Sequence, residues 1–311
     1  MEARICREVF MVRPCRFEFN YQTAHDNVFQ NEPMNGLKGN TQPKALREIE
    51  GLVQVLRDHK IDVTVGQDTL EPHTPDSIFP TNWVSSLPDG TICFYPLAAR
   101  NRRLERKPSQ MALLKNTYKI NRTVDFSSFE AEGKYLEGAA SVIIDYWNQV
   151  GYACLSGRTH RELVEKFVEE VGIPMCVIFE AKDENDVPIY HTDVMMCIAD
   201  NYATVCLDSI RDEGQKALLI RTLEASGKEV IPISIPQLRT FVGNMAQLQN
   251  SDGEKFAVMS TQAFKSLTEW QRTKLESFNQ ILHSDLSTIE EVGGGSAQCL
   301  MAKIYLQKKK H

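Results

Sequence analysis

The sequence lacks a long apolar run and an excess of positive charge. No stretch of its 311 residues is apolar over the length needed to span a bilayer, and the first residues lack the apolar core of a signal peptide. A formal net charge of -6 argues against a nucleic-acid partner, because phosphate contacts require a clustered basic surface. We therefore expect a cytoplasmic protein with no nucleic-acid and no membrane partner.

The chain also lacks a linker and a metal-binding cysteine motif. No Pro-, Gly- or Ser-rich stretch or composition step divides it, so we expect a single domain over residues 1–311. None of the eight cysteines stands in a C-x-x-C pair, and all except Cys299 are interpreted as reduced core thiols. The histidines show no paired spacing typical of metal ligands. No metal and no cofactor is predicted.

Short apolar strands alternate with helical segments, which is typical of an α/β protein. A strand at residues 8–12, a helix over 45–59 and a strand at 61–65 open the chain. Four hairpins follow, whose first strands are expected near residues 83–86, 140–145, 193–198 and 244–250. Helices are predicted after the last three hairpins, over residues 158–171, 212–226, 261–267 and 269–278. This recurrence indicates an array of similar units, and units closed in a ring would place the hairpin starts around a shared centre.

A cysteine follows three consecutive glycines near the end of the sequence, in Gly293-Gly294-Gly295-Ser296-Ala297-Gln298-Cys299. Consecutive glycines cost backbone entropy and are tolerated mainly where a ligand or another backbone approaches closely. Cys299 is interpreted as a nucleophile. The alternative is a small buried hydrophobic residue, which the segment taken alone favours.

Polar residues at the hairpin starts provide partners for such a thiol. They are Asp76, Asn82, Glu137, His191, Asp193 and Asn244. Cysteine, histidine and carboxylates are the components of a thiol-based covalent catalyst. Several carboxylates in one site also suit a cationic substrate, because a carboxylate binds a guanidinium in bidentate fashion.

In these segments the chain resembles the amidinotransferase/deiminase superfamily, the pentein fold, and it is most similar to a bacterial branch of citrulline-utilisation hydrolases. The resemblance covers nearly the whole chain. The matching segments are Asp76-Ser77-Ile78-Phe79-Pro80-Thr81-Asn82-Trp83, Asn101-Arg102-Arg103, Leu136-Glu137-Gly138, Leu155-Ser156-Gly157-Arg158-Thr159, His191-Thr192-Asp193, Gly243-Asn244 and the glycine run to Cys299. The resemblance implies a five-fold pseudosymmetric α/β propeller of ββαβ units with the active site at its central axis.

The resemblance also implies roles for single residues. Cys299 would attack the guanidino or ureido carbon, His191 would protonate the leaving amine and then activate water, and Glu137 would orient and charge the site. Substrate-binding positions are implied at Asp76, Asn82, Asp193, Arg102, Arg158 and Asn244. Taken singly, each acid could instead be a cap or turn residue, and Arg102 could belong to a solvated cluster with Arg103 and Arg106. Phe79 and Trp83 are more typical of the core.

Departures from the family pattern bear on the substrate. Asn82 stands where guanidinium-binding members carry an acid, Ala139-Ala140 stand where an aspartate often follows Glu-Gly-Gly, and Gln298 replaces an arginine beside the nucleophile. An amide can pair with a neutral ureido group without demanding positive charge. Citrulline or a similar ureido amino acid is therefore ranked above arginine, with methylated arginine third.

Three classes of function stay open. The first is a cysteine-dependent hydrolase of guanidino or ureido C–N bonds. The second is an amidinotransferase, in which a mobile loop at residues 31–41 would exclude water. The third is a catalytically silent amino-acid binder, against which intact Cys299, His191 and Glu137 count. Self-association into a homo-oligomer is compatible with the sequence, although no heptad is readable.

Overall fold

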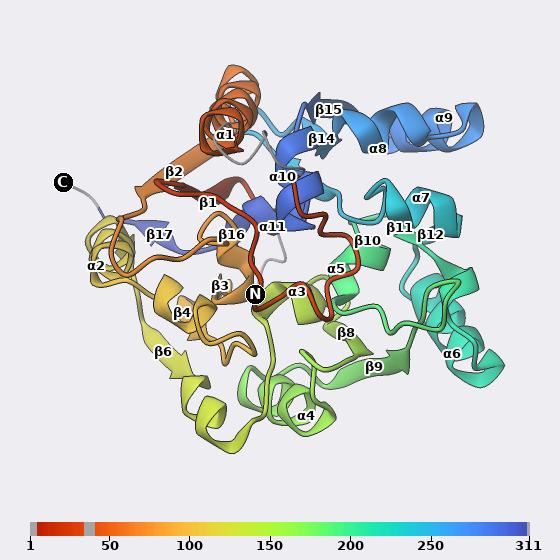
Figure 1. Ribbon diagram of the computed structural model, residues 1–311. Coiled ribbons are helices and arrows are strands. Elements are labelled where there is room, and N and C mark those ends of the chain that lie inside the picture. The colour runs from red at the N-terminus through yellow and green to blue at the C-terminus, as the bar shows by residue number, and fades with distance from the viewer. Residues whose placement is uncertain (1–4, 34–40, 310–311) are drawn as a thin grey trace.

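The computed structural model describes residues 5–33 and 41–309, which form a mixed α/β fold (Figure 1). Within these residues, no helix is both long and apolar enough to cross a membrane. The predicted alternation of strands and helices is confirmed along this part of the chain.

Five three-stranded sheets of the described chain share one topology, in which a first strand pairs antiparallel with a second and the second pairs parallel with a third. The first strands are β3 (Val84–Ser86), β7 (Val142–Asp145), β10 (Met196–Ile198), β13 (Ala246–Gln249) and β16 (Ala302–Ile304). The second strands are β4 (Thr91–Phe94), β8 (Val150–Leu155), β11 (Tyr202–Val205), β14 (Lys255–Ser260) and β1 (Glu8–Arg13). The third strands are β6 (Arg122–Asp125), β9 (Met175–Glu180), β12 (Glu229–Pro232), β15 (Gln280–Ser284) and β2 (Asp62–Gln67). A separate pair joins β5 (Tyr118–Lys119) to β17 (Gln307–Lys308).

One of these sheets combines the two ends of the chain. Strand β16 pairs with β1, so that Glu8 lies opposite Ile304, and β1 continues the sheet to β2. Met11, Leu282 and Leu300 are buried in one apolar cluster beside this sheet. Burial of such side chains stabilises the fold by roughly 1.5–3 kcal/mol each, so this contact between chain ends is part of the core.

Longer helices connect the second and third strands, because parallel pairing requires a crossover connection. They are α1 (Thr41–Asp58), α2 (Pro108–Thr117), α4 (Arg161–Glu170), α6 (Glu213–Ala225), α8 (Thr261–Ser266) and α9 (Glu269–Phe278). In α4, Leu163, Val164 and Phe167 share the buried face. Thr268 and Gln271 form a capping box that begins α9. The other helical segments outside the site are η2 (Arg102–Glu105), η3 (Ser127–Glu132), η4 (Leu207–Ser209), α7 (Ile235–Arg239) and α10 (Ser287–Gly293).

Short helical turns directly precede the first strands. They are η1 (Pro80–Asn82), α3 (Gly138–Ser141), α5 (Thr192–Met195) and α11 (Ala297–Leu300), and a turn at residues 240–244 precedes β13. Turn α3 contacts both η1 and α5, and α11 contacts η1. Figure 1 shows α3, α5 and α11 near the middle of the molecule, while α1, α2, α4, α6 and α9 lie at its periphery. The equivalent place of each turn in its unit thus brings distant parts of the sequence together.

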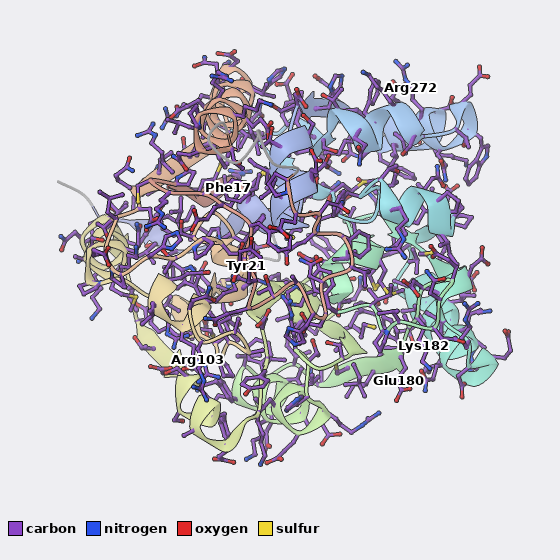
Figure 2. All side chains as sticks on the ribbon, in the orientation of Figure 1. Phe17, Tyr21, Arg103, Glu180, Lys182 and Arg272 are labelled. Atoms are coloured by element: carbon purple, nitrogen blue, oxygen red, sulfur yellow. The ribbon has the colours of Figure 1, made fainter. Side chains whose placement is uncertain are left out.

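Residues 14–33, called the strap below, run across these turns. Figure 2 shows Tyr21 of the strap near the centre of the view. The Asn20 amide donates to Asp76 Oδ2 at 2.7 Å, the Asn27 amide donates to the Gly294 carbonyl at 3.3 Å, and the Asn31 N–H donates to the Glu291 carbonyl at 2.7 Å. The predicted mobile loop at 31–41 lies largely outside the described residues, at 34–40.

The sequence prediction was wrong about where three first strands begin. Residues 193–195 belong to α5, residues 140–141 belong to α3, and residues 244–245 precede β13. Periodicity does not distinguish a short apolar run in a strand from one in a helix. The Thr192 hydroxyl fixes the α5 turn, because it donates to the Ser141 carbonyl at 2.6 Å and accepts from the Cys154 N–H at 2.7 Å.

The helix after the first hairpin, α2, was not predicted, although Pro108 occupies its first position.

The prediction that seven cysteines are core thiols also needs correction. Cys15 and Cys176 are only partly buried, but Cys176 packs against a buried apolar cluster, whereas the Cys15 thiol lies 3.3 Å from Asp68 Oδ2. The core prediction is therefore wrong for Cys15 and holds only in part for Cys176. Cys176 lies in β9, where successive side chains point to opposite faces and only alternate residues can be buried on one face.

Gly138→Ala tests the close packing of α3 on η1. A Cβ at Gly138 would lie 2.1 Å from the Thr81 carbonyl oxygen, and φ there is +60°. We expect a loss of about 2–4 kcal/mol in the free energy of unfolding, from the left-handed backbone together with overpacking. Gly172→Ala is the control, because φ is +72° there and no atom lies within 4 Å of the added Cβ. Equal losses in chemical denaturation of the two variants would contradict the packing argument.

Candidate active site

Cys299 lies in α11, just after the glycine run. Added Cβ atoms at Gly293 and Gly295 would come within 2.8 and 2.9 Å of the Phe79 ring. The glycines therefore allow the chain to pass directly against Phe79, which agrees with the predicted need for close approach. Phe79 is itself buried, as is Trp83. The Thr81 hydroxyl donates to the Cys299 carbonyl at 2.9 Å and ties α11 to η1.

The Cys299 thiol is buried between an amide and a carboxylate. The Asn244 amide donates to Sγ at 3.2 Å and to the Asp193 carbonyl at 2.9 Å, while Sγ lies 3.4 Å from Asp193 Oδ2. Burial, followed by the charge of Asp193, raises the pKa of Cys299 well above its usual value. In the free site the sulfur is therefore a neutral thiol, and a nearby cation is needed to make it a thiolate.

Asp193 is buried with one carboxylate oxygen free. Within the described part of the chain, Oδ1 has no hydrogen-bond partner. Burial raises the pKa of Asp193 to about 7, although the hydrogen bonds from Cys299 and Asn244 act in the opposite direction. A buried acceptor without a partner costs stability, so this oxygen is suited to receive a donor from a ligand.

His191 and Glu137 form a second buried pair. His191 Nε2 lies 2.8 Å from Glu137 Oε2, and Glu137 Oε1 accepts the Ala98 N–H at 3.0 Å. Burial by itself would raise the pKa of Glu137, but Arg158, His191 and Arg102 together hold it well below its ordinary value. Because an ionised carboxylate only accepts hydrogen bonds, Nε2 carries the proton and Nδ1 is left as an acceptor. Burial lowers the pKa of His191, which makes the neutral ring the resting form.

Two buried arginines surround Glu137. Arg102 Nη1 and Arg158 Nη1 lie 3.9 and 3.6 Å from Glu137 Oε2. Arg102 also donates to Glu105 at 2.8 Å and to Asn82 Oδ1 at 3.0 Å, and its Nε lies 3.7 Å from Asp76. Arg102 is 3% exposed, so the alternative of a solvated surface cluster is wrong for this residue.

Arg158 is occupied by an acid of the strap. Its guanidinium donates to both oxygens of Asp26 and to the Thr23 carbonyl at 3.2 Å. The Tyr190 ring lies 4.9 Å from the guanidinium carbon, close enough for a cation–π contact. Arg158 therefore already holds a carboxylate in the free protein.

The structure brings the nine predicted site residues into two linked groups. Cys299, Asn244 and Asp193 form the first group, and the second contains Glu137, His191, Arg102, Arg158, Asp76 and Asn82. Turn α5 joins them, since it carries Asp193 and begins after His191. Within the described residues no hydrogen bond joins Cys299 directly to His191.

Sequence reasoning missed three polar residues that contact this site. Asn20 holds Asp76, Asp26 occupies Arg158, and Glu105 pairs with Arg102. The i,i+3 spacing of Arg102 and Glu105 was a readable signal for their pairing. Asn20 and Asp26 come from the strap, which has no periodic pattern. Among the residues described, no group of three His, Cys, Asp or Glu side chains is arranged to hold a metal ion.

The chain belongs to the family of eukaryotic N,N-dimethylarginine dimethylhydrolases, whose sequence profile matches residues 13–306. The predicted superfamily is thereby confirmed, and the family carries the name of a hydrolase. No curated protein matches the chain at the level of sequence.

Three solved relatives share the fold. ArgZ, an arginine dihydrolase from the ornithine-ammonia cycle in cyanobacteria, is 16% identical with a TM-score of 0.72, over 95% of this chain and 40% of ArgZ. AgrE is 17% identical with a TM-score of 0.74, over 96% of this chain and 39% of AgrE. A dimethylarginine dimethylaminohydrolase adduct with S-methyl-L-thiocitrulline is 13% identical with a TM-score of 0.65, over 96% of this chain and 100% of that chain.

This chain thus spans about 40% of the length of ArgZ and AgrE. ArgZ has been solved with a covalent reaction intermediate, and AgrE with L-arginine and with ornithine and NAD+. At these low sequence identities, the structural similarity shows a shared fold and carries no statement about the substrate.

Asp193→Asn tests the cost of the buried acid. Because the folded-state pKa of about 7 lies above the usual aspartate pKa of 3.8, the folded protein binds more protons than the unfolded chain between these pH values. The contribution of Asp193 to stability is therefore present at low pH and is lost as pH rises through 7. Between pH 5 and pH 8 we expect the free energy of unfolding of the variant to rise by about 1–4 kcal/mol relative to that of the wild type, as measured by chemical denaturation. A constant difference between the two proteins across this range would contradict this account of Asp193.

Proposed function

We propose that the chain is a cysteine-dependent hydrolase that cleaves C–N bonds of a guanidino amino acid and accepts the neutral ureido product as a second substrate. L-Arginine would then proceed through citrulline to ornithine. The observation that carries this proposal is a set of buried polar atoms without partners in the described structure: Asp193 Oδ1, Asp76 Oδ1 and Asn82 Nδ2. Two acceptors and one donor suit a ligand that offers several N–H groups and, after one hydrolysis, a carbonyl oxygen.

Substrate binding supplies the nearby positive charge that thiolate formation at Cys299 requires. A guanidinium beside Asp193 would satisfy Oδ1 and place a positive charge near Sγ, which lies 3.4 Å from the same carboxylate. An opposite charge favours the thiolate and offsets the raised pKa of Cys299. Cys299 would therefore be activated by its cationic substrate, which limits reaction of the empty site with other electrophiles.

The first hydrolysis uses Cys299 and His191 in sequence. The Cys299 sulfur forms a bond to the guanidinium carbon, and one C–N bond of the guanidinium breaks. His191 transfers the thiol proton to the leaving ammonia, and a covalent thiouronium is left on the enzyme. Water then adds to this carbon with His191 as base, the C–S bond breaks, and the ureido product and a proton are released. Glu137 holds the Nε2–H of His191 throughout, so that Nδ1 carries the transferred proton.

Asn82 supports the second hydrolysis. Its Oδ1 accepts from Arg102 at 3.0 Å, which orients Nδ2 as a donor without a partner among the described residues. A carboxylate at this position would repel a ureido oxygen, whereas the amide N–H can bond it. Because the ureido group carries no charge to activate Cys299, neutral His191 would take the thiol proton in this step and pass it to the leaving ammonia. Attack on the ureido carbon leaves a thiocarbamate, whose hydrolysis yields a carbamate that loses CO2. The prediction that citrulline ranks above arginine stays a prediction.

The architecture favours the five-fold α/β propeller that the resemblance implies. Five sheets of equal topology each begin after a short turn, and four site segments lie on η1, α3, α5 and α11. A single domain over residues 1–311 and a cytoplasmic location are part of the same proposal, whereas a homo-oligomeric state stays a prediction.

Two other functions are compatible with the same fold. A transferase would use the same thiouronium with an amine in place of water, and a silent binder would not need the activated thiol.

A parallel assay of four substrates tests the function. Wild-type protein is incubated with L-arginine, L-citrulline, dimethylarginine and agmatine, and ornithine, citrulline, ammonia and methylamines are quantified. We expect ornithine from both arginine and citrulline, and little turnover of agmatine, because it has no α-carboxylate for Arg158. Cys299→Ser should lower turnover by roughly a thousandfold or more, and Cys176→Ser, in a partly exposed thiol of β9, should not.

Other products would change the conclusion. Citrulline that accumulates from arginine without ornithine would remove the second step. An amidino adduct formed when glycine or lysine is added would indicate a transferase. Failure of Cys299 to react with 2-chloroacetamidine, together with no turnover, would indicate a binder.

Asp26→Asn tests whether Arg158 receives the substrate carboxylate. In the free protein the Asp26 carboxylate occupies this guanidinium, and a substrate would have to displace it. The variant removes the competing charge, so we expect KM to fall severalfold while kcat changes little. Asp252→Asn, which breaks an exposed pair with Lys60, is the control. A rise in KM for Asp26→Asn would mean that Asp26 itself contacts the substrate.

A further inference from the structure

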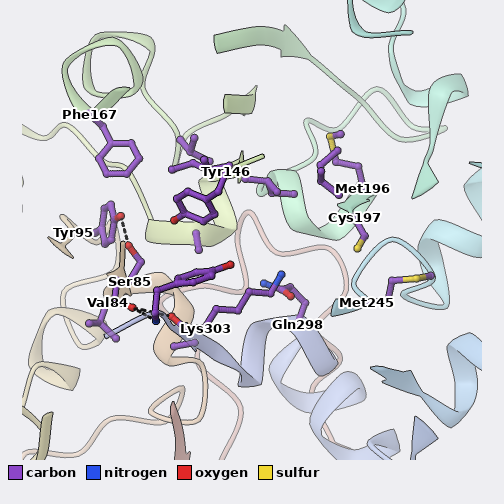
Figure 3. Close-up of a pocket in the computed structure, with 18 residues that line it drawn as sticks. Val84, Ser85, Tyr95, Tyr146, Phe167, Met196, Cys197, Met245, Gln298 and Lys303 are labelled. Carbon is purple, nitrogen blue, oxygen red and sulfur yellow. Dashed lines mark hydrogen bonds between the residues drawn. The ribbon is translucent and has the colours of Figure 1, made fainter. Parts of the chain in front are cut away.

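A cavity lies on the strand side of the catalytic turns. It is lined by residues of β3, β7, β10 and β16, together with neighbours of the site residues. Gln298 directly precedes Cys299, Met245 follows Asn244, and Ala139 follows Glu137 by two residues. None of the nine predicted site residues lines this cavity. It is therefore a separate space that shares a wall with the candidate active site, and it is called the axial cavity below (Figure 3).

Two polar side chains of the axial cavity have unused bonding capacity. Gln298 is 8% exposed, and its Oε1 has no hydrogen-bond partner in the described structure. Lys303 lines the same cavity, and within the described residues its ammonium forms no ion pair. Figure 3 shows the side chains of Lys303 and Gln298 extending into the same part of the cavity. By contrast, the Ser85 and Tyr95 hydroxyls bond each other at 2.6 Å.

The charge of Lys303 is not balanced by an acid in the lining. Within the described part of the chain, no Asp or Glu lines the axial cavity. A second cavity adjoins it and shares Lys303, Tyr146 and Tyr305. Asp145 and Asp200 line that second cavity, but they pair with Lys228 and Lys255. Lys303 thus offers its positive charge to a ligand.

The remaining lining defines the size and polarity of such a ligand. Val142, Met196 and Ala302 contribute apolar wall. Each of the two adjoining cavities has a volume of about 60 Å³, which is room for about four to six water-sized groups. Trp147, 69% exposed, lines the second cavity and marks its open side. The space suits a short organic anion.

We propose that the axial cavity is a binding site for a short 2-hydroxy monocarboxylate, whose carboxylate pairs with Lys303 and whose hydroxyl donates to Gln298 Oε1. The ammonium supplies a charge-assisted hydrogen bond to the carboxylate. The hydroxyl satisfies the buried amide oxygen, and the carbon chain lies against the apolar wall. This ligand satisfies the two unused polar groups and the apolar lining together.

Binding at Lys303 also acts on the candidate active site. The positive charge of Lys303 lowers the pKa of Asp193, so an anion on Lys303 would raise it. The other groups that face Asp193 are Cys299 and Asn244, and its charge also acts on Tyr190 and Cys197. This effect on activity rests on the proposed function, whereas binding itself does not.

Titration calorimetry with L-lactate and propionate tests the site directly. The two anions are matched, because propionate lacks only the hydroxyl. We expect millimolar binding of lactate to the wild type, several times weaker binding of propionate, and a loss of about tenfold or more for lactate in Lys303→Met. Lys265→Met, an exposed lysine of α8, is the control and should bind lactate like the wild type.

Two results would overturn the proposal. One is no binding of lactate by the wild type at concentrations of about ten times the expected dissociation constant. The other is unchanged lactate binding in Lys303→Met, which would place the anion elsewhere, for example on Arg158. If Lys303→Met does not fold, Gln298→Leu serves instead, because it should abolish the preference for lactate over propionate. A retained preference would contradict the role of Gln298.

The pH profile of kcat/KM provides the second readout. With lactate bound, the acidic limb should move to higher pH, and Lys303→Met should show the same shift without lactate. If lactate binds but the limb does not move, the site exists without influence on catalysis, and the coupling is overturned. If no substrate is turned over at all, the proposed function fails while the calorimetric result stands.

Discussion

The buried ionised carboxylate of Glu137 is the constraint on which the site depends. Three proton-bearing groups hold it, with His191 at 2.8 Å and the two arginines at 3.6 and 3.9 Å. Removal of any one would leave charge without compensation in a medium of low dielectric, which is costly. The same contacts fix the tautomer of His191 and the position of Arg102, which in turn orients Asn82. One network thereby aligns residues from three turns.

The site combines this satisfied network with unsatisfied groups around the thiol. Asp193 is buried without a counter-charge, and Cys299 is held as a neutral thiol beside it. Such an arrangement destabilises the free protein and would be relieved by the cationic substrate proposed above, as is expected where function needs a destabilised site. The strap acts on another part of the site, where Asp26 occupies the guanidinium of Arg158.

The repeated topology explains how distant residues meet. Each first strand begins after a short turn, so residues that are hundreds of positions apart occupy equivalent places. The positive φ of Gly138 and the absence of side chains at Gly293 and Gly295 let these turns pack closely. Longer side chains there would separate α3 from η1 and α11 from Phe79. The strands beyond the turns then enclose the axial cavity, so both spaces follow from one packing arrangement.

The sequence by itself determined the α/β class, most hairpins and helices, and the residue types at the turns, because local periodicity and turn chemistry act over a few residues. The family resemblance added the grouping of Cys299, His191 and Glu137. Only the tertiary structure decided that Arg102 is buried, that Asp26 occupies Arg158, and that Lys303 is left without an acid in the axial cavity. The physical reason is that burial and pairing of a charge depend on which distant segments surround it, and no local pattern in the sequence encodes those neighbours.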